Sequence, residues 1–243
     1  MAKAPIAKSG SRVKERLAHS LRAAILSGRL APGQRVVEGL WSRKFSVAQA
    51  SVREAINLLI AEGFLLKGIG RSARVVQYSE QDVERVYQVR AALEGLAASL
   101  ACTAHADLSP MTAALHTMIS AAKRRDMRAL VAGDLRYHLC LAEAAGNPLL
   151  AEILRRLLTP LFAFALLRAL KRHQGPGAWT RDIPSHRRMI EIIREGNPLV
   201  AQHYVQHSVR GFAASANSIW ETSALSSAAD ISNKRRKKSP THK

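Results

Sequence analysis

Cysteines and acidic residues are scarce in this sequence. Only two cysteines, Cys102 and Cys140, occur among its 243 residues, and no Cys-x-x-Cys motif for metal or redox chemistry is present. No signal-like apolar stretch follows the N-terminus, so we expect a reducing, cytoplasmic location. The most apolar stretch, residues 157–170, contains Pro160 and Arg168 and is shorter than the ~20 residues that a membrane-spanning helix needs. We therefore expect a globular protein without a membrane span.

The excess of basic over acidic residues lies mainly at the two ends of the chain. The sequence has 37 Lys and Arg against 18 Asp and Glu. Residues 1–78 contain 14 basic and 4 acidic residues, residues 79–232 contain 17 and 14, and residues 233–243 contain 6 and none. A basic segment beside a near-neutral one is typical of a polyanion-binding protein, although surface solvation is the simpler alternative. The lead, residues 1–10, and the basic tail, residues 224–243, are expected to be disordered.

The stretch from Glu38 to Gly63 predicts two short amphipathic helices. Apolar residues recur at helical spacing on both sides of the turn at Phe45-Ser46-Val47. Two helices separated by so short a turn must cross, which is the geometry of a helix-turn-helix whose second helix can enter a DNA major groove. An apolar stripe over residues 12–27 predicts a further helix that packs behind this pair.

A basic β-hairpin is predicted after the second helix of this pair. Residues 64–66 and 73–76 are short apolar runs joined by a glycine-containing loop. A helix-turn-helix followed by such a hairpin is a winged helix. Its tip would carry Lys67, Arg71 and Arg74 along the phosphates or into the minor groove.

The remainder of the chain, residues 79–223, shows only helical periodicity. Ser79 and Asp82 are placed to form an N-terminal capping box. Turn and stop signals divide the rest into six predicted helices, at residues 81–105, 110–125, 127–145, 148–172, 181–195 and 198–222. The expected fold is mainly α: a winged helix-turn-helix domain over residues 11–78, followed by an all-α six-helix bundle.

Three polar residues are predicted to point into the apolar interior of this bundle. Asp134 and His138 lie one turn apart on the third bundle helix, and His186 shares its face of the fifth with apolar residues. A buried carboxylate requires a partner. Imidazole and carboxylate ligands suit Zn, Ni, Mn or Fe better than Ca. A purely structural Asp–His hydrogen bond is the alternative.

Three motifs in the first 78 residues resemble those of GntR-type bacterial transcription regulators. They are LRAAILSGRLAPGQRVVE, VREAINLLIAEGF and GRSARV, in the order in which the family has them. The resemblance covers about 65 residues and implies a winged-helix domain that binds double-stranded DNA.

The start of the second helix departs from this family. Where the family usually has Val-Ser-Arg-Thr-Pro-Val-Arg, residues 47–53 read VAQASVR. Arg53 is retained where the resemblance implies a DNA contact, whereas Gln49 could pair with adenine and Ser51 could reach a phosphate. The candidate DNA-binding residues are Arg43, Lys44, Gln49, Ser51, Arg53, Lys67, Arg71 and Arg74. The basic pair on the first helix of the motif would contact phosphates or simply be solvated.

Residues 81–222 resemble the helical effector domain of the FadR branch of the family, in its smaller VanR-like group. The spacing Asp134-x-x-x-His138, the AAGNP motif that follows it, and His186 match the pattern of this domain. The resemblance implies that these three residues bind a divalent metal.

The fourth metal ligand does not follow from this resemblance alone. The family spacing reaches Ser208, but the histidine stands at His207, so His207, water or the effector could complete the site. Arg90, in a matching Arg-x-x-x-Glu pattern, and Arg136 are candidates for binding an effector carboxylate.

Together these features predict a transcription regulator, expected to be a repressor without enzymatic activity. We expect a homodimer on a palindromic operator, with no membrane partner. A small organic acid in the bundle would change the placement of the DNA-binding domains. The alternatives are a metal-dependent hydrolase with a DNA-binding appendage and a protein that coats DNA without sequence preference.

Overall fold

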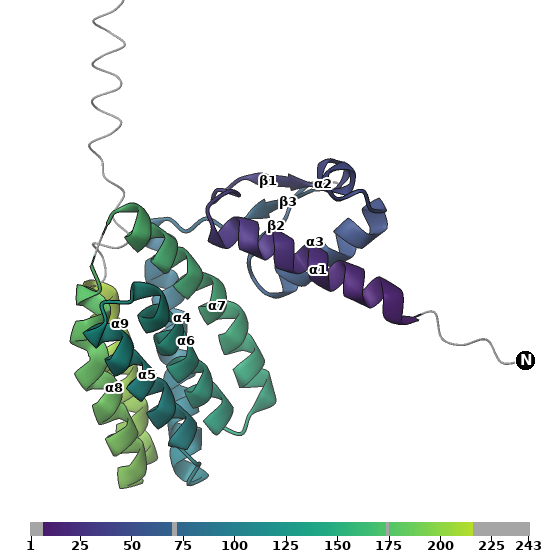
Figure 1. The fold of residues 1–243 in the computed structure, drawn as a ribbon. Coiled ribbons are helices and arrows are strands. Elements are labelled where there is room, and N and C mark those ends of the chain that lie inside the picture. Colours follow the sequence, from purple (N-terminus) through teal and green to yellow (C-terminus); the bar gives the residue numbers. More distant parts are fainter. Residues whose placement is uncertain (1–6, 70–71, 174, 216–243) are drawn as a thin grey trace, which may run out of the picture.

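The computed structural model describes residues 7–69, 72–173 and 175–215. Its elements form an N-terminal group of helices α1 to α3 with three strands, and a bundle of helices α4 to α9 (Figure 1). In chain order they are α1 Ala7–Leu26, β1 Arg35–Val37, α2 Glu38–Phe45, α3 Gln49–Ala61, β2 Leu65–Lys67, β3 Ser72–Val75, α4 Glu80–Thr103, α5 Ser109–Lys123, α6 Met127–Ala144, α7 Pro148–Lys171, α8 Gly177–Glu195 and α9 Pro198–Ser215. The predicted fold class, a winged helix-turn-helix followed by an all-α bundle, is confirmed.

The N-terminal group is a winged helix built on a small antiparallel sheet. The strand order is β1-β3-β2, with Val36 paired to Ala73 and Leu66 paired to Arg74. Helix α2 ends at Ser46, whose φ of 53° turns the chain toward α3. The buried side chains of α1, α3 and the sheet form a common core, so α3 is held with its opposite face toward solvent.

Short polar side chains begin several of the bundle helices. The Ser79 hydroxyl accepts a hydrogen bond from the Asp82 amide at 3.1 Å, and the Asp82 carboxylate accepts one from the Ser79 amide at 3.1 Å. This is the predicted capping box. Asp126 and Asn147 cap α6 and α7 with one hydrogen bond each, accepted from the Ala129 and Leu150 amides. Such caps satisfy amides that a helix leaves unpaired at its first turn.

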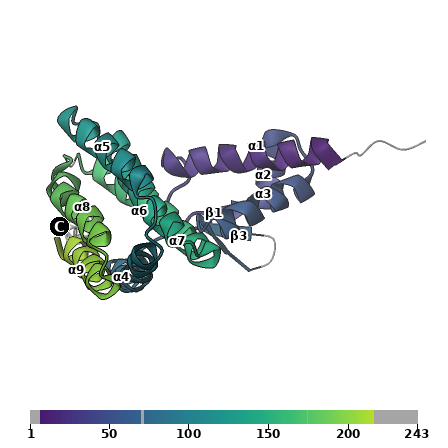
Figure 2. The same cartoon turned by 90° about the horizontal axis from the view of Figure 1, so that it is seen from below.

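Helix α7 is the bundle helix that lies beside the N-terminal group in both views (Figures 1 and 2). Gly63, with φ of +80°, packs so closely on α7 that a Cβ there would lie 2.7 Å from the Arg156 carbonyl oxygen. Pro160 lies inside α7 and has no amide hydrogen to bond that carbonyl, four residues earlier. Gly63 thus packs where the helix backbone is interrupted.

Two helix starts differ from the prediction. Helix α1 begins at Ala7, so residues 7–10 are helical and not part of a disordered lead; alanine and lysine extend a helix beyond its apolar stripe. Helix α8 begins at Gly177 and not at Arg181, since Trp179, 3% exposed, already packs in the core. Residues 1–6 and the predicted tail lie outside the described residues.

Within the described ranges, no helix is both long enough and apolar enough to cross a membrane.

Candidate functional site

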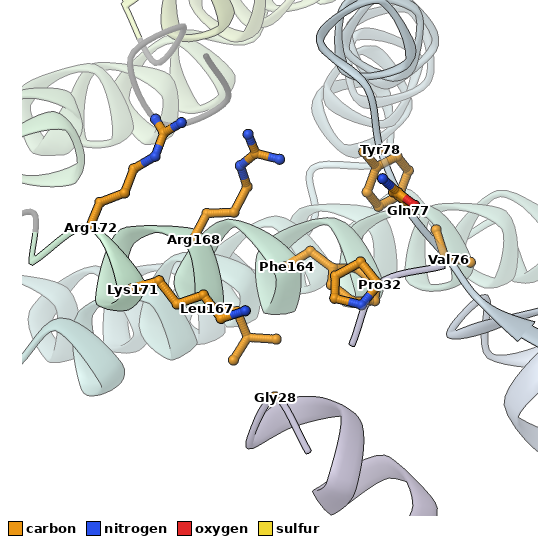
Figure 3. Close-up of a pocket in the computed structure, with 10 residues that line it drawn as sticks. All are labelled: Gly28, Pro32, Val76, Gln77, Tyr78, Phe164, Leu167, Arg168, Lys171 and Arg172. Atoms are coloured by element: carbon orange, nitrogen blue, oxygen red, sulfur yellow. The ribbon is translucent and has the colours of Figure 1, made fainter. Parts of the chain in front are cut away.

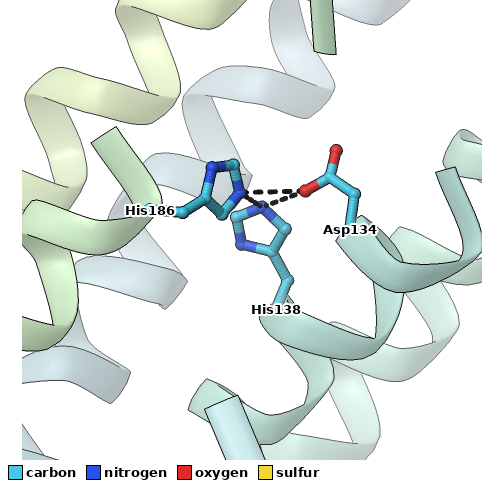
Figure 4. A group of neighbouring side chains, drawn as sticks. All are labelled: Asp134, His138 and His186. Atoms are coloured by element: carbon cyan, nitrogen blue, oxygen red, sulfur yellow. Dashed lines mark hydrogen bonds and ion pairs between the residues drawn. The ribbon is translucent and has the colours of Figure 1, made fainter. Parts of the chain in front are cut away.

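Three potential metal ligands meet in the centre of the bundle. Asp134 and His138 extend from α6 and His186 from α8, and their ligand atoms point toward one another (Figure 4). Asp134 Oδ1 lies 2.9 Å from His186 Nε2 and 3.2 Å from His138 Nε2, and the two Nε2 atoms are 3.3 Å apart. The exposed fraction of each of the three residues is 3% or less. The structure thus brings together three of the four predicted metal ligands.

The other ring nitrogens of the two histidines are held by acceptors. His186 Nδ1 donates to the Asp182 carbonyl oxygen at 2.8 Å. His138 Nδ1 lies 2.6 Å from Glu94 Oε2 as an ion pair, without the geometry of a hydrogen bond. The Asp182 carbonyl favours hydrogen on Nδ1 of His186, so its Nε2 either donates to Asp134 when the ring is protonated or offers a lone pair to a metal ion. Metal-binding histidines are usually oriented in this way by a carboxylate or a carbonyl group.

The local charges favour a positive charge on His186. Burial lowers the pKa of His186, but its hydrogen bond to Asp134 and the charge of Asp134 outweigh burial and raise that pKa to about 9. Burial raises the pKa of Asp134, but hydrogen bonds to the two histidines outweigh it and hold that pKa far below its usual range. A proton on His186 or a metal ion can each supply the positive charge.

The distances within this cluster fit a metal ion. Zinc binds histidine nitrogen and carboxylate oxygen at ~2.0–2.2 Å. Ligands at those distances, separated by ~90–110° around the ion, lie ~2.9–3.5 Å from each other. The observed separations of 2.9, 3.2 and 3.3 Å fall in this range.

Arg90 contributes a fixed positive charge beside the histidines. Its Nε donates to Glu94 Oε1 at 2.6 Å, and its Nη2 lies 2.7 Å from His138 Nε2. The guanidinium also packs over the rings of Tyr87 and Phe162, 5.1 Å from each centroid. Arg90, a predicted effector contact, therefore contacts one of the predicted metal ligands.

Two predicted residues lie apart from this cluster. His207 is exposed on α9, whereas Ser208 lines the small cavity beside His138 and His186. Arg136 is also exposed, 3.5 Å from Glu143. On a helix adjacent residues point in directions ~100° apart, so α9 directs Ser208 and not His207 toward the histidines.

The space beside the cluster is small. The cavity lined by Arg90, His138, His186 and Ser208 has a volume of about 10 Å³, roughly enough for one water molecule. An organic acid would have to separate the surrounding side chains before it could reach the cluster.

The predicted DNA-binding residues that the structure describes lie at or near the surface of the N-terminal group. Arg43, Lys44, Gln49, Arg53, Lys67 and Arg74 are exposed, and Ser51 is partly buried. Arg71 lies outside the described residues. Lys44 stacks on Trp41, 4.6 Å from the ring centroid, and Arg74 donates to the Gly33 carbonyl at 3.1 Å.

Arg53 is held by an acidic partner at the start of α2. Its Nη2 lies 2.9 Å from Glu38 Oε2, and its Nε is 3.0 Å from Glu38 Oε1. Glu38 is 6% exposed, whereas the Arg53 side chain is 48% exposed. A two-point contact of this kind fixes the plane of the guanidinium while leaving its outer edge accessible.

Two of these partners, Glu38 and Glu94, were not predicted from the sequence. Glu38 could have been noticed as one of only four acidic residues in the first 78. Glu94 appeared only as part of a motif, although its spacing of four from Arg90 places both on one helix face. The interaction of Glu94 with His138 could not be predicted, because it joins two different helices.

Comparison with known proteins gives the family. Residues 13–75 match the model described as "Bacterial regulatory proteins, gntR family", and residues 85–211 match the FCD domain. The "Probable D-xylose utilization operon transcriptional repressor" of Paenarthrobacter nicotinovorans is 28% identical over 195 residues, which cover 77% of this chain and 81% of that protein. The "Glc operon transcriptional activator" of Escherichia coli K12 is 25% identical over 217 residues, covering 81% and 85%.

A solved structure supports the fold. Escherichia coli McbR/YncC superposes with a TM-score of 0.66 at 17% identity, covering 86% of this chain and 99% of that chain. The family models, the winged helix and the helical bundle with its buried Asp-His-His cluster agree. The chain belongs to the gntR family of bacterial transcription regulators and carries an FCD domain.

Proposed function

We propose that this regulator acts in the cytoplasm as a homodimer that represses transcription from a palindromic operator. The observation that carries the proposal is the exposed edge of Arg53, on a helix whose other face is buried in the winged-helix core. One small winged helix buries too little surface for specific binding, so two copies on two half-sites are expected. The relatives include one named as a repressor and one named as an activator; we favour repression.

Fluorescence anisotropy on DNA from upstream of the gene tests this proposal. The full chain should bind that DNA more tightly than a scrambled sequence of equal length, at several salt concentrations. Sedimentation of the complex should give two chains per operator. Equal affinity for both sequences would contradict operator recognition and favour nonspecific coating.

We infer that Asp134, His138 and His186 bind a divalent transition metal, with Zn, Ni, Mn and Fe as candidates. The convergence of three buried ligand atoms supports the inference, and the Asp182 carbonyl orients His186 so that its Nε2 faces Asp134. The metal would supply a positive centre that can hold a carboxylate.

A charge count connects the metal to an acidic effector. Without metal, Arg90 and protonated His186 oppose the carboxylates of Glu94, Asp134 and Asp182, the last with Oδ2 3.5 Å from His186 Nδ1. A divalent ion that replaces the proton on His186 raises the charge of this buried site by one. A monocarboxylate bound to that ion would restore the original charge, and Arg90 could turn its Nη2 from His138 to that carboxylate.

Elemental analysis and melting curves test the metal. Purified protein should contain close to one equivalent, and chelation should lower the thermal midpoint. Asp134→Asn should remove both effects, whereas Asp126→Asn, at the exposed start of the same helix, should not. Less than a tenth of an equivalent, with the same midpoint before and after chelation, would contradict the inference.

The fourth ligand is proposed to be water or the effector carboxylate, next to Ser208. His207→Ala should therefore leave metal affinity unchanged, because the His207 side chain is exposed. A loss of affinity in His207→Ala but not in Ser208→Ala would show that α9 rotates to present the histidine.

An effector screen should be run with and without metal. Small organic acids are expected to raise the thermal midpoint of the metal-loaded protein and to change its affinity for operator DNA. An acid that stabilises chelated and metal-loaded protein equally would contradict binding through the metal.

A further inference from the structure

A second, larger cavity lies at the junction of the winged helix and the bundle. It has a volume of about 300 Å³ (Figure 3), at the lower end of the ~300–1,000 Å³ typical of small-molecule sites. Its walls are the turn after α1, the linker after β3, and α7. It shares no lining residue with the cavity beside His138. This junction cavity is therefore a separate site.

The inner wall of the junction cavity is apolar and firmly packed. Phe164 is 3% exposed, and its ring meets Tyr78 edge to face with centroids 5.9 Å apart. Leu167, Pro32 and Val76 continue this apolar lining. Such a surface favours a hydrocarbon or aromatic group over water.

Three positive side chains lie beside this apolar wall. Arg168, Lys171 and Arg172 come from the last turns of α7, and none of the ten lining residues is acidic. Arg168 and Arg172 extend in parallel from one side of the helix, whereas Lys171 extends toward Gly28 (Figure 3).

The grouping of these cations has an electrostatic cost. Burial and the neighbouring charge of Arg172 lower the pKa of Arg168, and Glu80 only partly opposes them. Like charges held together at the edge of an apolar cavity are stabilised by an anion. The combination of an apolar wall and a positive edge defines the chemistry of a matching ligand.

We propose that the junction cavity binds a small amphipathic carboxylate. Its apolar body would lie against Phe164 and Leu167, and its carboxylate would lie beside Arg168 and Arg172. A volume of about 300 Å³ suits a short acyl chain or a single aromatic ring. Lys171, Gln77 and Pro32 are exposed, so a ligand can enter from solvent.

Binding in this cavity would affect the placement of the DNA-binding domain. Gly28, Pro32 and Val76 belong to the winged helix or its edge, and the cations belong to the bundle. A ligand that contacts both walls favours the domain arrangement in which both are within reach. This step rests on the proposed DNA-binding function, whereas ligand binding itself does not.

Calorimetry with octanoate tests the proposed binding. The full chain, treated with chelator, should bind octanoate at least about tenfold more tightly than 1-octanol, because a charge-assisted contact contributes more than a neutral one. Arg168→Gln should weaken octanoate binding about tenfold, and Arg155→Gln, an exposed change on the same helix, should not. Equal binding of the acid and the alcohol, or equal effects of the two variants, would overturn the proposal.

Two further variants locate the ligand. Leu167→Trp should fill the cavity and abolish octanoate binding, while Asp134→Asn should leave it intact. If Leu167→Trp fails to fold, as judged by circular dichroism, the effect of Arg168→Gln shows whether octanoate binds in the junction cavity. Binding that is lost in Asp134→Asn but kept in Arg168→Gln would place octanoate at the histidines and overturn the proposal.

The coupling to DNA is measured separately. Octanoate should change operator affinity in the unsubstituted protein but not in Arg168→Gln. If no operator is found, the calorimetric result stands and only the proposed regulation fails. If octanoate binds at the junction without changing operator affinity, the proposed coupling between the domains is overturned.

Discussion

Two glutamate–arginine pairs in this protein have similar contact distances and very different surroundings. Glu94 and Arg90 meet at 2.6 Å in the centre of the bundle, with side chains 0% and 3% exposed. Glu38 and Arg53 meet at 2.9 Å on the winged helix, with side chains 8% and 48% exposed. The first pair is enclosed with two histidines, and the second has its arginine partly in water.

This difference shows that burial decides what such a pair contributes. An enclosed charge that loses its partner cannot be solvated, so removing one member of the Glu94–Arg90 pair should destabilise the fold strongly. A half-exposed pair contributes ~0–1 kcal/mol to stability. Its role is to hold Arg53 in a fixed orientation at the surface that is proposed to bind DNA.

The largest expected effect comes from breaking the enclosed pair. Glu94→Gln leaves Arg90 buried without its countercharge and should lower the free energy of unfolding by ~3–5 kcal/mol. For a chain of this size the thermal midpoint should fall by roughly 10 °C. Glu84→Gln, an exposed change on the same helix, is the matched control. Equal midpoints for the two variants would show that the buried pair is dispensable.

The pH dependence of the metal-free protein should reveal the charge on His186. Its pKa in the folded protein is raised to about 9, above the unfolded value of ~6.5. The resulting stabilisation is fully present below pH ~6.5 and is lost as the pH rises through about 9. We expect a loss on the order of 2–3 kcal/mol over this range.

Metal-loaded protein is the control for this titration. A bound metal takes the place of the proton on His186, so the stability of loaded protein should change much less between pH 6.5 and 9. Metal affinity should increase over the same range, because fewer protons compete. Parallel pH profiles for chelated and loaded protein would contradict this account.

Breaking the exposed pair from the arginine side should affect DNA binding and leave the fold intact. Arg53→Ala should weaken operator binding ~10- to 100-fold, the equivalent of ~1–3 kcal/mol for a bidentate base contact. Anisotropy titrations on operator DNA measure this effect. Arg16→Ala, an exposed change on α1, should have little effect. If both variants weaken binding equally, Arg53 contributes only general positive charge.

The smallest effect is expected from replacing Glu38, the acidic member of the Glu38–Arg53 pair. Glu38→Gln retains Arg53 but removes the charge that orients it, so stability should change by less than about 1 kcal/mol. The ratio of operator to scrambled-DNA affinity should fall a few-fold, because nonspecific binding gains from the loss of a negative charge. Glu54→Gln, on the same domain and paired at 3.8 Å with Lys14, controls for charge alone. If the ratio falls equally in both variants, Glu38 does not orient Arg53 for DNA binding.

Local sequence patterns were sufficient to predict most of the fold. The apolar periodicity of residues 79–223 predicted six bundle helices, and Ser79 with Asp82 predicted the start of α4. The same reasoning placed Asp134, His138 and His186 on inward faces, because helical phase depends only on residues close in sequence. His207, named as a candidate fourth ligand, was misplaced: it is exposed, and α9 directs Ser208 toward the histidines.

The remaining features depend on contacts between distant segments. The junction cavity is formed by the turn after α1, the linker and α7, and no local pattern indicates that these surfaces meet. The start of α8 was misplaced because glycine and proline signals near residue 176 outweighed a single tryptophan. Glu38 was overlooked because its partner, Arg53, lies 15 residues away.

The short connection between the two domains limits how this protein can be recombined with its relatives. Between the end of β3 at Val75 and the start of α4 at Glu80, Val76 bonds the Phe64 carbonyl and Ser79 closes the capping box. A chimeric biosensor that combines the winged helix of one family member with the FCD domain of another needs more than a matching linker length. Gly63 of the winged helix packs on the turn of α7 that contains Pro160. These two positions therefore have to be exchanged together.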